Sequence, residues 1–256
     1  MRLQGKVALV TGAANDRSIG WGIARALADE GADVVVNDVS QLDALEQRAA
    51  ELRALGRRAL AIPADVTNYQ QVNDMIARTA AEMGRLDIVA SNAGIIRWEP
   101  LLEVTPRNLQ AIVNVNLKGN VYVCQAAARQ MVTQGNGGRI IITSSVQADI
   151  QFTINPIYGA TKYAMHVFTG CLALELAPHH ITVNHIGPGW VQSPLNDPTP
   201  DLQTAEGVER QRQAVPLKRS GEAYEMGRAA VYFAADGDYV TGVGLRVDGG
   251  LAIGKY

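Results

Sequence analysis

Two side chains four residues apart, Tyr158 and Lys162, could together form a proton-transfer pair. In a helix, residues at this spacing lie on one face, one turn from each other. A free tyrosine has a pKa of about 10, and lowering it to about 7 requires about 4 kcal/mol of preferential stabilisation of the phenolate. One ammonium at about 4 Å supplies about 4 kcal/mol at an effective dielectric constant of about 20, before desolvation of the phenolate is subtracted. We therefore expect Lys162 to provide most of the pKa shift of Tyr158, and a second cation to complete it.

A tyrosine activated in this way suits a general acid or base that acts on an alcohol or a carbonyl. Ser145 closely follows the apolar run Arg139–Ile142, which has the composition of a buried strand, and its hydroxyl can bond to the same substrate oxygen. The alternative is that Tyr-x-x-x-Lys occurs here by chance, as it does in many helices. The catalytic interpretation therefore needs a partner motif elsewhere in the chain.

The composition is that of a globular protein rather than of a nucleic-acid-binding or membrane protein. The 256 residues are 47% hydrophobic and 19% charged, with a formal net charge of −2. A chain of this length can bury about 70–75% of its unfolded surface. The charge balance argues against a polyanion-binding surface, and no apolar segment reaches the roughly 18 residues of a membrane span. We expect no nucleic-acid partner and no membrane association.

Two cysteines and four histidines give no sign of a disulfide framework or a metal site. Cys124 and Cys171 lie in apolar helical contexts without C-x-x-C spacing, so we expect packing residues in a reducing compartment. The N-terminal apolar run Val7–Val10 is too short for a signal peptide. These features predict a cytoplasmic protein, and we expect the histidines, including His185, to be structural.

The N-terminal region has the pattern of a dinucleotide-binding unit. Val7–Val10 is wholly apolar, as a strand buried on both faces must be, and it ends at a glycine turn. The alanine-rich stretch Ser18–Glu30 is helical in character, and a second apolar strand, Val34–Asn37, is followed by Asp38. Glycines let the backbone approach a pyrophosphate at the N-terminus of the helix, and the acid accepts hydrogen bonds from ribose hydroxyls.

The alternation of strand and helix continues along the chain. Further strands are expected at Ala59–Ile62, Leu86–Ala90, Arg139–Ile142, Ile181–Ile186 and Gly244–Val247. Further helices are expected at Gln41–Leu55, Gln70–Met83, Thr105–Gln134, Tyr158–Ala177 and Glu222–Ala235. Seven strands alternating with helices predict an α/β fold, a Rossmann-type doubly wound parallel sheet covered on both faces. Because no linker or repeat divides the chain, we expect one domain over residues 1–256.

The alternation fails in the segment 193–216. Pro194, Pro198 and Pro200 interrupt it, polar residues dominate, and only Gln203–Gln213 is helical in character. A proline-rich polar stretch of this length inside a regular α/β pattern is typical of a functional loop. We expect it to be a mobile flap at the substrate site.

Taken together, the motifs resemble those of the short-chain dehydrogenase/reductase (SDR) family, nearest to its sugar and polyol dehydrogenases and its 3-oxoacyl reductases. The resemblance spans nearly the whole chain, and its motifs jointly are highly specific. They are the glycine turn after the first strand, the acid after the second, Asn92-Ala93-Gly94 after the fourth, and Ser145…Tyr158-x-x-x-Lys162 after the fifth.

The resemblance implies hydride transfer between a substrate carbon and a nicotinamide, which interconverts a secondary alcohol and a ketone, or a lactol and a lactone. Tyr158 would exchange a proton with the substrate oxygen, and Ser145 would orient that oxygen. Lys162 would lower the pKa of Tyr158 and bind the nicotinamide ribose, and the oxidised nicotinamide would be the second cation. Asn116, in the segment NVNLKGN, would hold a proton-relay water.

The resemblance also implies which residues hold the dinucleotide. Gly22 would join the pyrophosphate turn, Asp65 would contact the adenine amino group, and Asn92 the adenosine side. Val191 and Ser193 would meet the nicotinamide carboxamide. The complete set expected at the cofactor is Gly12, Asn15, Arg17, Ser18, Ile19, Gly20, Asp38, Asp65, Val66, Asn92, Ala93, Gly94, Tyr158, Lys162, Pro188, Gly189, Val191 and Ser193.

The glycine turn is longer than the common turn of the family, because Gly12 and Gly20 are eight residues apart. This longer turn, with Ser18-Ile19 before Gly20, is similar to the enoyl-thioester reductase branch of the superfamily. That branch generally spaces its tyrosine and lysine seven apart, and position 165 here is Met165. The resemblance therefore favours carbonyl and alcohol chemistry over reduction of a carbon–carbon double bond.

Two residues bear on the choice of cofactor. Asp38 argues for NAD, because a carboxylate that binds ribose hydroxyls repels a 2′-phosphate. Arg17, in the long turn, is the counterargument, because a guanidinium there could reach such a phosphate. We expect NAD, with NADP as the alternative.

The substrate is expected to be a small hydroxyl or carbonyl compound, and the segments 188–196 and 239–250 resemble the sugar and polyol dehydrogenases of the family. Ile96 and Trp98 weaken the case for glucose itself, and Arg97 could bind a carboxylate or phosphate, although a surface role is the expectation. Amides and an indole suit hydroxyl-rich rings. The residues expected to face the substrate are Gln147, Gln151, Asn155, Trp190 and Asn196.

Two further functions stay open at this point. One is reduction of 3-oxoacyl thioesters with NADPH. The other is a cofactor-binding regulatory protein without turnover, although the intact Ser145, Tyr158 and Lys162 argue against it. The resemblance also implies a homo-oligomer, a tetramer formed through helices such as Thr105–Gln134 and Tyr158–Ala177.

Overall fold

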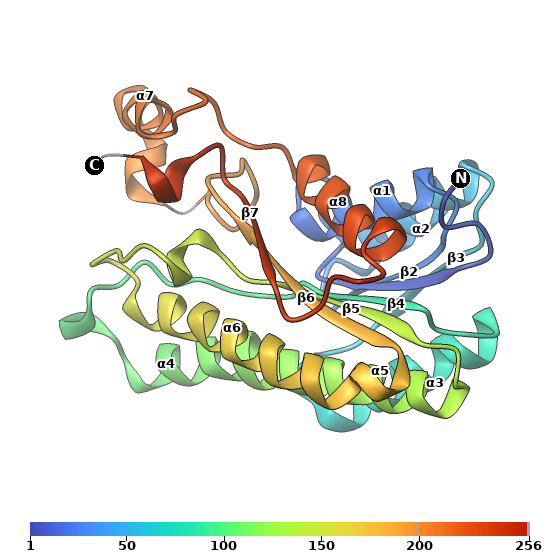
Figure 1. Ribbon diagram of the computed structural model, residues 1–256. Helices are drawn as coiled ribbons and strands as arrows, with labels where there is room; N and C mark the ends of the chain where they lie inside the picture. The colour runs from blue at the N-terminus through green and yellow to red at the C-terminus, as the bar shows by residue number, and fades with distance from the viewer. Residues whose placement is uncertain (198, 255–256) are drawn as a thin grey trace.

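One seven-stranded sheet organises the computed structural model, which describes residues 1–197 and 199–254 (Figure 1). All its strand pairs are parallel, in the order β3-β2-β1-β4-β5-β6-β7. The predicted seven-stranded parallel sheet is confirmed. The strands are β1 (Val7–Thr11), β2 (Asp33–Asp38), β3 (Ala59–Pro63), β4 (Ile88–Ser91), β5 (Gly138–Thr143), β6 (Ile181–Pro188) and β7 (Gly244–Val247).

Helices cover both faces of the sheet, so the fold is doubly wound, as predicted (Figure 1). One layer holds α1 (Ile19–Asp29), α2 (Leu42–Ala54) and α8 (Ala223–Val231). The other holds α3 (Tyr69–Met83), α4 (Pro106–Ile112), α5 (Asn120–Gln134) and α6 (Pro156–Leu176). Helix α7 (Ala205–Ala214) lies beyond the carboxyl ends of the strands.

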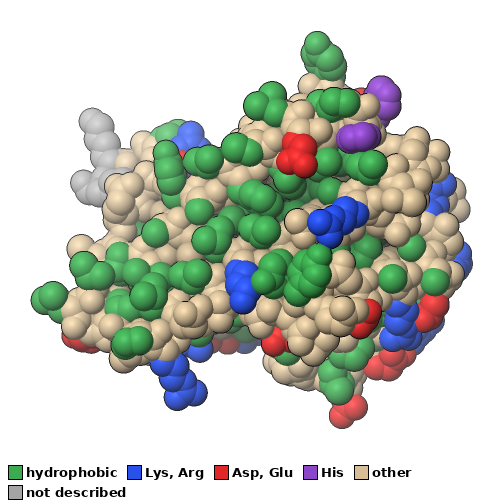
Figure 2. Space-filling model, turned by 90° about the horizontal axis from the view of Figure 1, so that it is seen from below, with side chains coloured by type: hydrophobic (Ala, Val, Ile, Leu, Met, Phe, Trp, Pro, Cys, Tyr) green, Lys and Arg blue, Asp and Glu red, His purple; other side chains and the backbone are tan. Residues whose placement is uncertain are grey.

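The outer face of the α4–α6 layer carries exposed apolar side chains, which Figure 2 shows as green areas. On α6 these include Tyr163, Val167 and Leu174. Cys171, on the same helix, is also exposed, whereas Cys124 is fully buried. The prediction that both cysteines are packing residues is therefore wrong for Cys171. Among the described residues, no helix is long and apolar enough to cross a membrane, and the cytoplasmic location stays a prediction.

The central strands β1 and β4 are buried on both faces because each helix layer needs an apolar surface to pack on, whereas the edge strand β7 is largely exposed. In β1, Ala8 and Val10 pack in the core that includes α1 and α8. Val7 and Leu9, which alternate with them, pack in the core that includes α3 and α5. This arrangement explains why the strand is a continuous apolar run rather than an alternating one.

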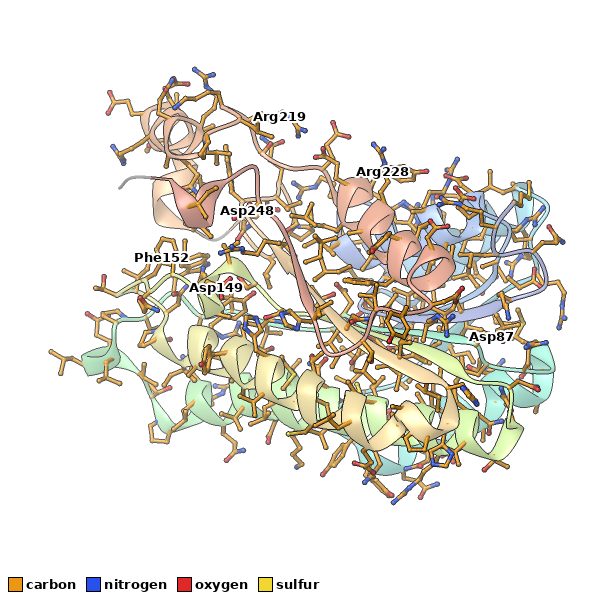
Figure 3. All side chains as sticks on the ribbon, in the orientation of Figure 1. Asp87, Asp149, Phe152, Arg219, Arg228 and Asp248 are labelled. Atoms are coloured by element: carbon orange, nitrogen blue, oxygen red, sulfur yellow. The ribbon has the colours of Figure 1, made fainter. Side chains whose placement is uncertain are left out.

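The two ends of the sheet differ. Because β1 lies between β2 and β4, the chain winds in opposite directions on its two sides, and the crevice at the carboxyl ends of such strands is a ligand site. At the amino ends, Asp87 accepts hydrogen bonds from the backbone of Val7 (2.9 Å) and from Nε of Arg85 (2.7 Å). Figure 3 shows Asp87 at this end and Asp149, which follows β5, at the other.

Helices α1 and α8 pack with their backbones close together. A Cβ at Gly22 would come within 2.2 Å of the carbonyl oxygen of Ala223, and a Cβ at Gly227 within 2.3 Å of the carbonyl oxygen of Gly22. Gly22 therefore serves the packing of these two helices, and its place in the pyrophosphate turn stays a prediction.

The predicted helix Thr105–Gln134 is divided into α4, a π-helical segment Val113–Gly119, and α5. Its start is as expected: the Thr105 hydroxyl accepts a hydrogen bond from the backbone of Asn108 (3.2 Å), and a proline takes the first position. The π-helical segment holds Asn116, and such segments are frequent at functional sites.

The segment predicted as a flap contains a 3₁₀ turn, Pro200–Gln203, and helix α7. The Thr204 hydroxyl accepts a hydrogen bond from the backbone of Gly207 (3.0 Å) and begins the helix. Pro198, one of the prolines on which the prediction rested, lies outside the described residues. The mobility of this segment stays a prediction.

Candidate active site

A cavity of about 790 Å³ follows the carboxyl ends of the strands across the point where the winding reverses. Six predicted residues are not part of its lining: Arg17, Gly20, Gly22, Asn116, Gln151 and Asn155. The predicted residues that line it are Gly12, Asn15, Ser18, Ile19, Asp38, Asp65, Val66, Asn92, Ala93, Gly94, Ser145, Gln147, Tyr158, Lys162, Pro188, Gly189, Trp190, Val191, Ser193 and Asn196.

Ser145 follows β5 and begins a 3₁₀ turn, Val146–Ala148. Its Oγ accepts a hydrogen bond from the backbone N–H of Gln147 (3.1 Å). A hydroxyl that already accepts still has its own proton to donate. The backbone turn therefore leaves the Ser145 proton available to an oxygen in the cavity.

Tyr158 is buried in the first turns of α6, and its pKa is opposite to the expectation from sequence. Burial raises the pKa of the phenol to about 12, and a hydrogen bond with Ser145 lowers it only in part. The Nζ of Lys162 lies 5.5 Å from the centre of the phenol ring. The expectation that Lys162 provides most of a downward shift is wrong for the protein alone, because desolvation is the larger effect.

Lys162 lies beneath the same part of the cavity. Its Nζ donates a hydrogen bond to the carbonyl oxygen of Thr143 (2.8 Å), at the end of β5. Burial lowers its pKa to about 8. The Ser144 hydroxyl donates to the carbonyl oxygen of Lys162 (3.0 Å), which fixes α6 against the strand. An ammonium has three donors, so two remain for groups above it.

Asn116 is fully buried behind the lining rather than in it. Its Oδ1 accepts a hydrogen bond from the backbone N–H of Ile95 (2.8 Å), and its Nδ2 donates to the carbonyl oxygen of the same residue (2.8 Å). Both ends of the amide are thus used to hold the loop after β4. Its proposed relay of protons through a water stays a prediction.

The loop after β4 is also fixed by Asn92. The Asn92 backbone N–H donates to Oγ1 of Thr11 (2.9 Å), and its Oδ1 accepts from Oγ1 of Thr143 (3.0 Å). Asn92 therefore ties β4 to the ends of β1 and β5. A Cβ at Gly94 would come within 3.5 Å of the Lys162 Nζ, so this loop lies directly over the lysine.

The turn after β1 fits a dinucleotide pyrophosphate. Gly12 has φ +70°, and a Cβ at Gly20 would come within 2.2 Å of the carbonyl oxygen of Gly12. The turn therefore folds closely onto the start of α1, where the Ser18 hydroxyl accepts a hydrogen bond from the backbone of Trp21 (3.0 Å). The N-terminus of this helix presents backbone N–H groups and a positive dipole end to the cavity, which suits a diphosphate.

Asp38 lines the cavity at the end of β2, with its carboxylate already oriented. Its Oδ1 accepts from the backbone of Val39 (2.8 Å) and its Oδ2 from the backbone of Ala14 (3.2 Å). The Oδ1 also accepts from the backbone of Ser40 (3.4 Å). A carboxylate accepts about four hydrogen bonds, so one site remains for a ribose hydroxyl. Arg17, the counterargument, forms an ion pair with Asp197, in the segment predicted as a flap.

At the opposite end, three buried polar atoms of the lining have no hydrogen-bond partner among the described residues. They are Nε1 of Trp98, Oε1 of Gln147 and Oγ1 of Thr199. Buried polar groups are nearly always paired, so a side-chain rotation that turns these atoms toward the cavity would let a polar ligand pair with them. Trp98 and Thr199 were not predicted as substrate contacts. Both lie in irregular segments, where no periodic pattern of apolar residues indicates which side chains are buried.

The remaining substrate candidates have other surroundings. Trp190 lines the cavity, and Asn196 lines it while its Nδ2 donates to the carbonyl oxygen of Val191 (2.8 Å). Gln151 is exposed and Asn155 is buried, both outside the lining.

His185 is not part of the cavity lining. Its ring stacks on that of His166, with centroids 4.0 Å apart, and burial lowers its pKa to about 4. A neutral, stacked imidazole fits the structural role expected from the sequence. Among the described residues, no group of histidine, cysteine and acidic side chains could hold a metal ion.

A family model described as "Enoyl-(Acyl carrier protein) reductase" matches residues 12–252. The L-rhamnose 1-dehydrogenase (NAD(P)(+)) of a Sphingomonas strain is 35% identical to this chain, over 98% of each protein. The chain belongs to the short-chain dehydrogenase/reductase family. A second SDR, the 2-dehydro-3-deoxy-D-gluconate 5-dehydrogenase of Dickeya dadantii, is 36% identical over 97% of this chain and 96% of that protein.

The fold agrees with this membership. The crystal structure of a short-chain type dehydrogenase/reductase from Mycobacterium marinum superposes with a TM-score of 0.90 at 37% identity, covering 97% of this chain and 96% of that one. As an SDR, the protein is an NAD(P)-dependent oxidoreductase that acts on the CH–OH group of its substrates. The resemblance inferred from the motifs is confirmed.

Proposed function

We propose that this SDR oxidises a sugar or a polyol with NAD, converting a secondary alcohol to a ketone or a lactol to a lactone. One observation carries the proposal: Ser145 and Tyr158 share a cavity with the three unpaired polar atoms of Trp98, Gln147 and Thr199. A ligand with several hydroxyl groups can pair with all three while it presents one carbinol to Tyr158. The names of the two dehydrogenases described above support a sugar substrate.

We assign a role to each side chain in this reaction. The Ser145 hydroxyl, fixed through its acceptor bond from Gln147, donates to the substrate oxygen and places the carbinol beside Tyr158. The Tyr158 oxygen takes the hydroxyl proton as general base. The Lys162 ammonium stabilises the phenolate and, with its two unused donors, holds the ribose hydroxyls. When bound, the oxidised nicotinamide supplies the hydride acceptor and a second positive charge.

The preference for NAD follows from Asp38. Its oriented carboxylate lines the cavity at the end of β2, where it would accept a hydroxyl of the adenosine ribose and repel a 2′-phosphate. The Arg17 guanidinium is bound to Asp197 and is not part of the cavity lining. We therefore assign the cofactor preference to the acid rather than to the arginine.

The exposed apolar face of α6 supports the homo-oligomer expected from the sequence. Contiguous exposed apolar side chains on a helix, here Tyr163, Val167 and Leu174, are typical of a protein–protein interface. We propose that copies of this chain associate through this layer as a tetramer. Light scattering on the purified protein measures the assembly, and a monomer at micromolar concentration would contradict it.

A second candidate, reduction of 3-oxoacyl thioesters with NADPH, is favoured by the apolar side chains Phe152 and Ile154 at the cavity. One experiment separates the two: NAD and NADP reduction against sugars, polyols and hydroxy acids, together with NADPH oxidation by a 3-oxoacyl thioester. Activity with NAD and a sugar or polyol supports the proposal. Activity confined to NADPH and the thioester would select the second candidate, and no hydride transfer with any compound would select a regulatory protein.

A further inference from the structure

We propose that the substrate is an uncharged sugar or polyol that carries a deoxygenated edge, such as a methyl group in place of a terminal hydroxymethyl group. This inference rests on the proposed function and narrows it. It is carried by two observations at the substrate end of the cavity, namely the placement of charged groups and an apolar wall.

The first observation concerns charge. Among the described side chains that line the cavity, the charged ones are Asp38, Asp65 and Lys162. The two acids follow β2 and β3, on the far side of the β1–β4 switch point from Ser145. Lys162 is bound to Thr143 beneath the reacting oxygen, where it serves the tyrosine. The described residues at the substrate end therefore offer no further cation to a carboxylate or a phosphate.

Three guanidinium groups outside the lining already have partners, and one of them, Arg17, lines an adjoining cavity that shares Trp190 and Ser193 with this one. Arg97 donates to the carbonyl oxygen of Ile96 (2.9 Å), and Arg17 pairs with Asp197. Arg246 lies 3.8 Å from Asp149. An anionic group on the substrate would thus find no cation in the cavity lining other than Lys162, and burial of a charge without a partner is strongly unfavourable.

The second observation is an apolar wall at the mouth of the cavity. Phe152 and Ile154 line the cavity and yet are 37% and 40% exposed. Figure 3 shows Phe152 at the end of the molecule where the segment carrying α7 faces the α6 layer. Large apolar side chains left this open gain from contact with an apolar part of a ligand. Further apolar lining residues at this end are Ile96, Val146, Leu195 and Leu202.

The substrate end of the cavity therefore carries two kinds of lining group, polar atoms without a partner and an apolar wall. The atoms Nε1 of Trp98, Oε1 of Gln147 and Oγ1 of Thr199 need hydroxyl partners, and the wall of Phe152 and Ile154 does not. A fully hydroxylated ligand would bring a hydroxyl group against the wall, and a fully apolar ligand would leave the three polar atoms unpaired. A deoxygenated, uncharged polyhydroxy compound satisfies both kinds of lining group.

The inference is tested with sugars that share one ring and differ only at carbon 6. Suitable series are D-fucose, D-galactose and D-galacturonate, and D-quinovose, D-glucose and D-glucuronate, with L-rhamnose and L-mannose as a further pair. For each series that is oxidised, we expect kcat/KM with NAD to be about 10- to 100-fold higher for the methyl than for the hydroxymethyl compound. We expect the carboxylate to be lower than the hydroxymethyl compound by about 100-fold or more.

The outcomes separate this inference from the proposed function. A uronate oxidised as well as its hydroxymethyl counterpart would overturn the uncharged substrate. A hydroxymethyl compound preferred over its methyl counterpart would overturn the deoxygenated edge. Absence of turnover with every sugar and polyol would instead contradict the proposed function, and the inference with it.

A variant of the wall gives an independent test. Ile154→Lys places a cation at the cavity mouth, and Ile154→Gln is the neutral polar control. We expect Ile154→Lys to raise the ratio of uronate to deoxysugar kcat/KM by about tenfold or more, and Ile154→Gln to raise it by less than about threefold. Equal ratios in the two variants would show that the wall does not face the carbon-6 group.

Discussion

The side chain and the backbone of Gln147 have different roles at the active site. The backbone N–H orients the Ser145 hydroxyl, while Oε1 of the side chain is buried without a partner among the described residues. The variant Gln147→Ala keeps the backbone N–H that orients Ser145 and removes the unpaired side-chain oxygen. We expect the substrate KM to rise about tenfold and the NAD KM to change less than about twofold, from steady-state kinetics.

Gln151→Ala is the matched control, because Gln151 is exposed and outside the cavity lining. It should leave both KM values within about twofold of the unmodified enzyme. A larger effect on the NAD KM than on the substrate KM in Gln147→Ala would remove Gln147 from the substrate site.

Asp38 and Arg17 make opposite predictions for cofactor choice. Asp38→Ala removes the acceptor for a ribose hydroxyl, so the dissociation constant of NAD should rise about 10- to 100-fold and discrimination against NADP should fall. Arg17→Ala should change the preference less than about threefold, because the exposed Arg17–Asp197 pair contributes little. Titrations of both variants with NAD and NADP show which of the two residues sets the cofactor preference. An unchanged preference in Asp38→Ala, with a large change in Arg17→Ala, would reverse the assignment.

For individual residues, the sequence predicted which side chains share the active site better than it predicted their pKa values. The motif placed Tyr158, Lys162 and Ser145 in one cavity, because residue spacing on a helix and after a strand is set by regular geometry. It did not predict that burial raises the pKa of Tyr158 to about 12, because burial depends on residues distant in the chain. Thr199 was missed for the same reason.

At the scale of elements, α8 begins with a capping box whose contribution to stability should depend on pH. Glu225 accepts a hydrogen bond from the backbone of Glu222 (2.8 Å) and two from Arg219 (2.8 and 2.6 Å). The hydrogen bonds from Arg219 lower the pKa of Glu225 to about 2. A carboxyl group with a lowered pKa contributes stability above its unfolded pKa, and this contribution is lost as the pH falls toward the folded value.

Glu225→Gln should therefore lower the free energy of unfolding at pH 7 by about 0.5–1 kcal/mol, measured by urea denaturation. The difference from the unmodified protein should shrink as the pH falls from about 5 to about 3. Glu103→Gln, at an exposed position, should show neither effect. A difference that does not depend on pH would mean that the ion pair with Arg219 is not its source.

The elements themselves were predicted unevenly. Strands were located because a continuous apolar run that ends at a glycine or an acid is typical of a strand buried on both faces, as in β1. The division of 105–134 was missed, because the π-helical Val113–Gly119 keeps the residue types of an α-helix. The packing role of Gly22 was missed, because the approach of α8 to α1 is a tertiary contact.

At the scale of the molecule, the winding of the sheet explains why one cavity holds all the chemistry. The carboxyl ends of the parallel strands meet at one edge, so residues far apart in sequence, such as Asp38, Ser145 and Trp190, line the same cavity. The position of the cavity follows from strand order and handedness, which alternating sequence patterns predict. The substrate end could not be predicted in the same way, because irregular segments such as 193–197 supply part of it.

The central claim is that the Tyr158 phenol is the group that exchanges the proton with the substrate. Tyr158→Phe keeps the ring and its packing, and removes only the oxygen. The decisive measurement is kcat of this variant beside its NAD dissociation constant. We predict a loss of kcat of about 100- to 10,000-fold or more, with NAD affinity within about twofold. Turnover within about tenfold of the unmodified enzyme, with NAD bound normally, would contradict the account.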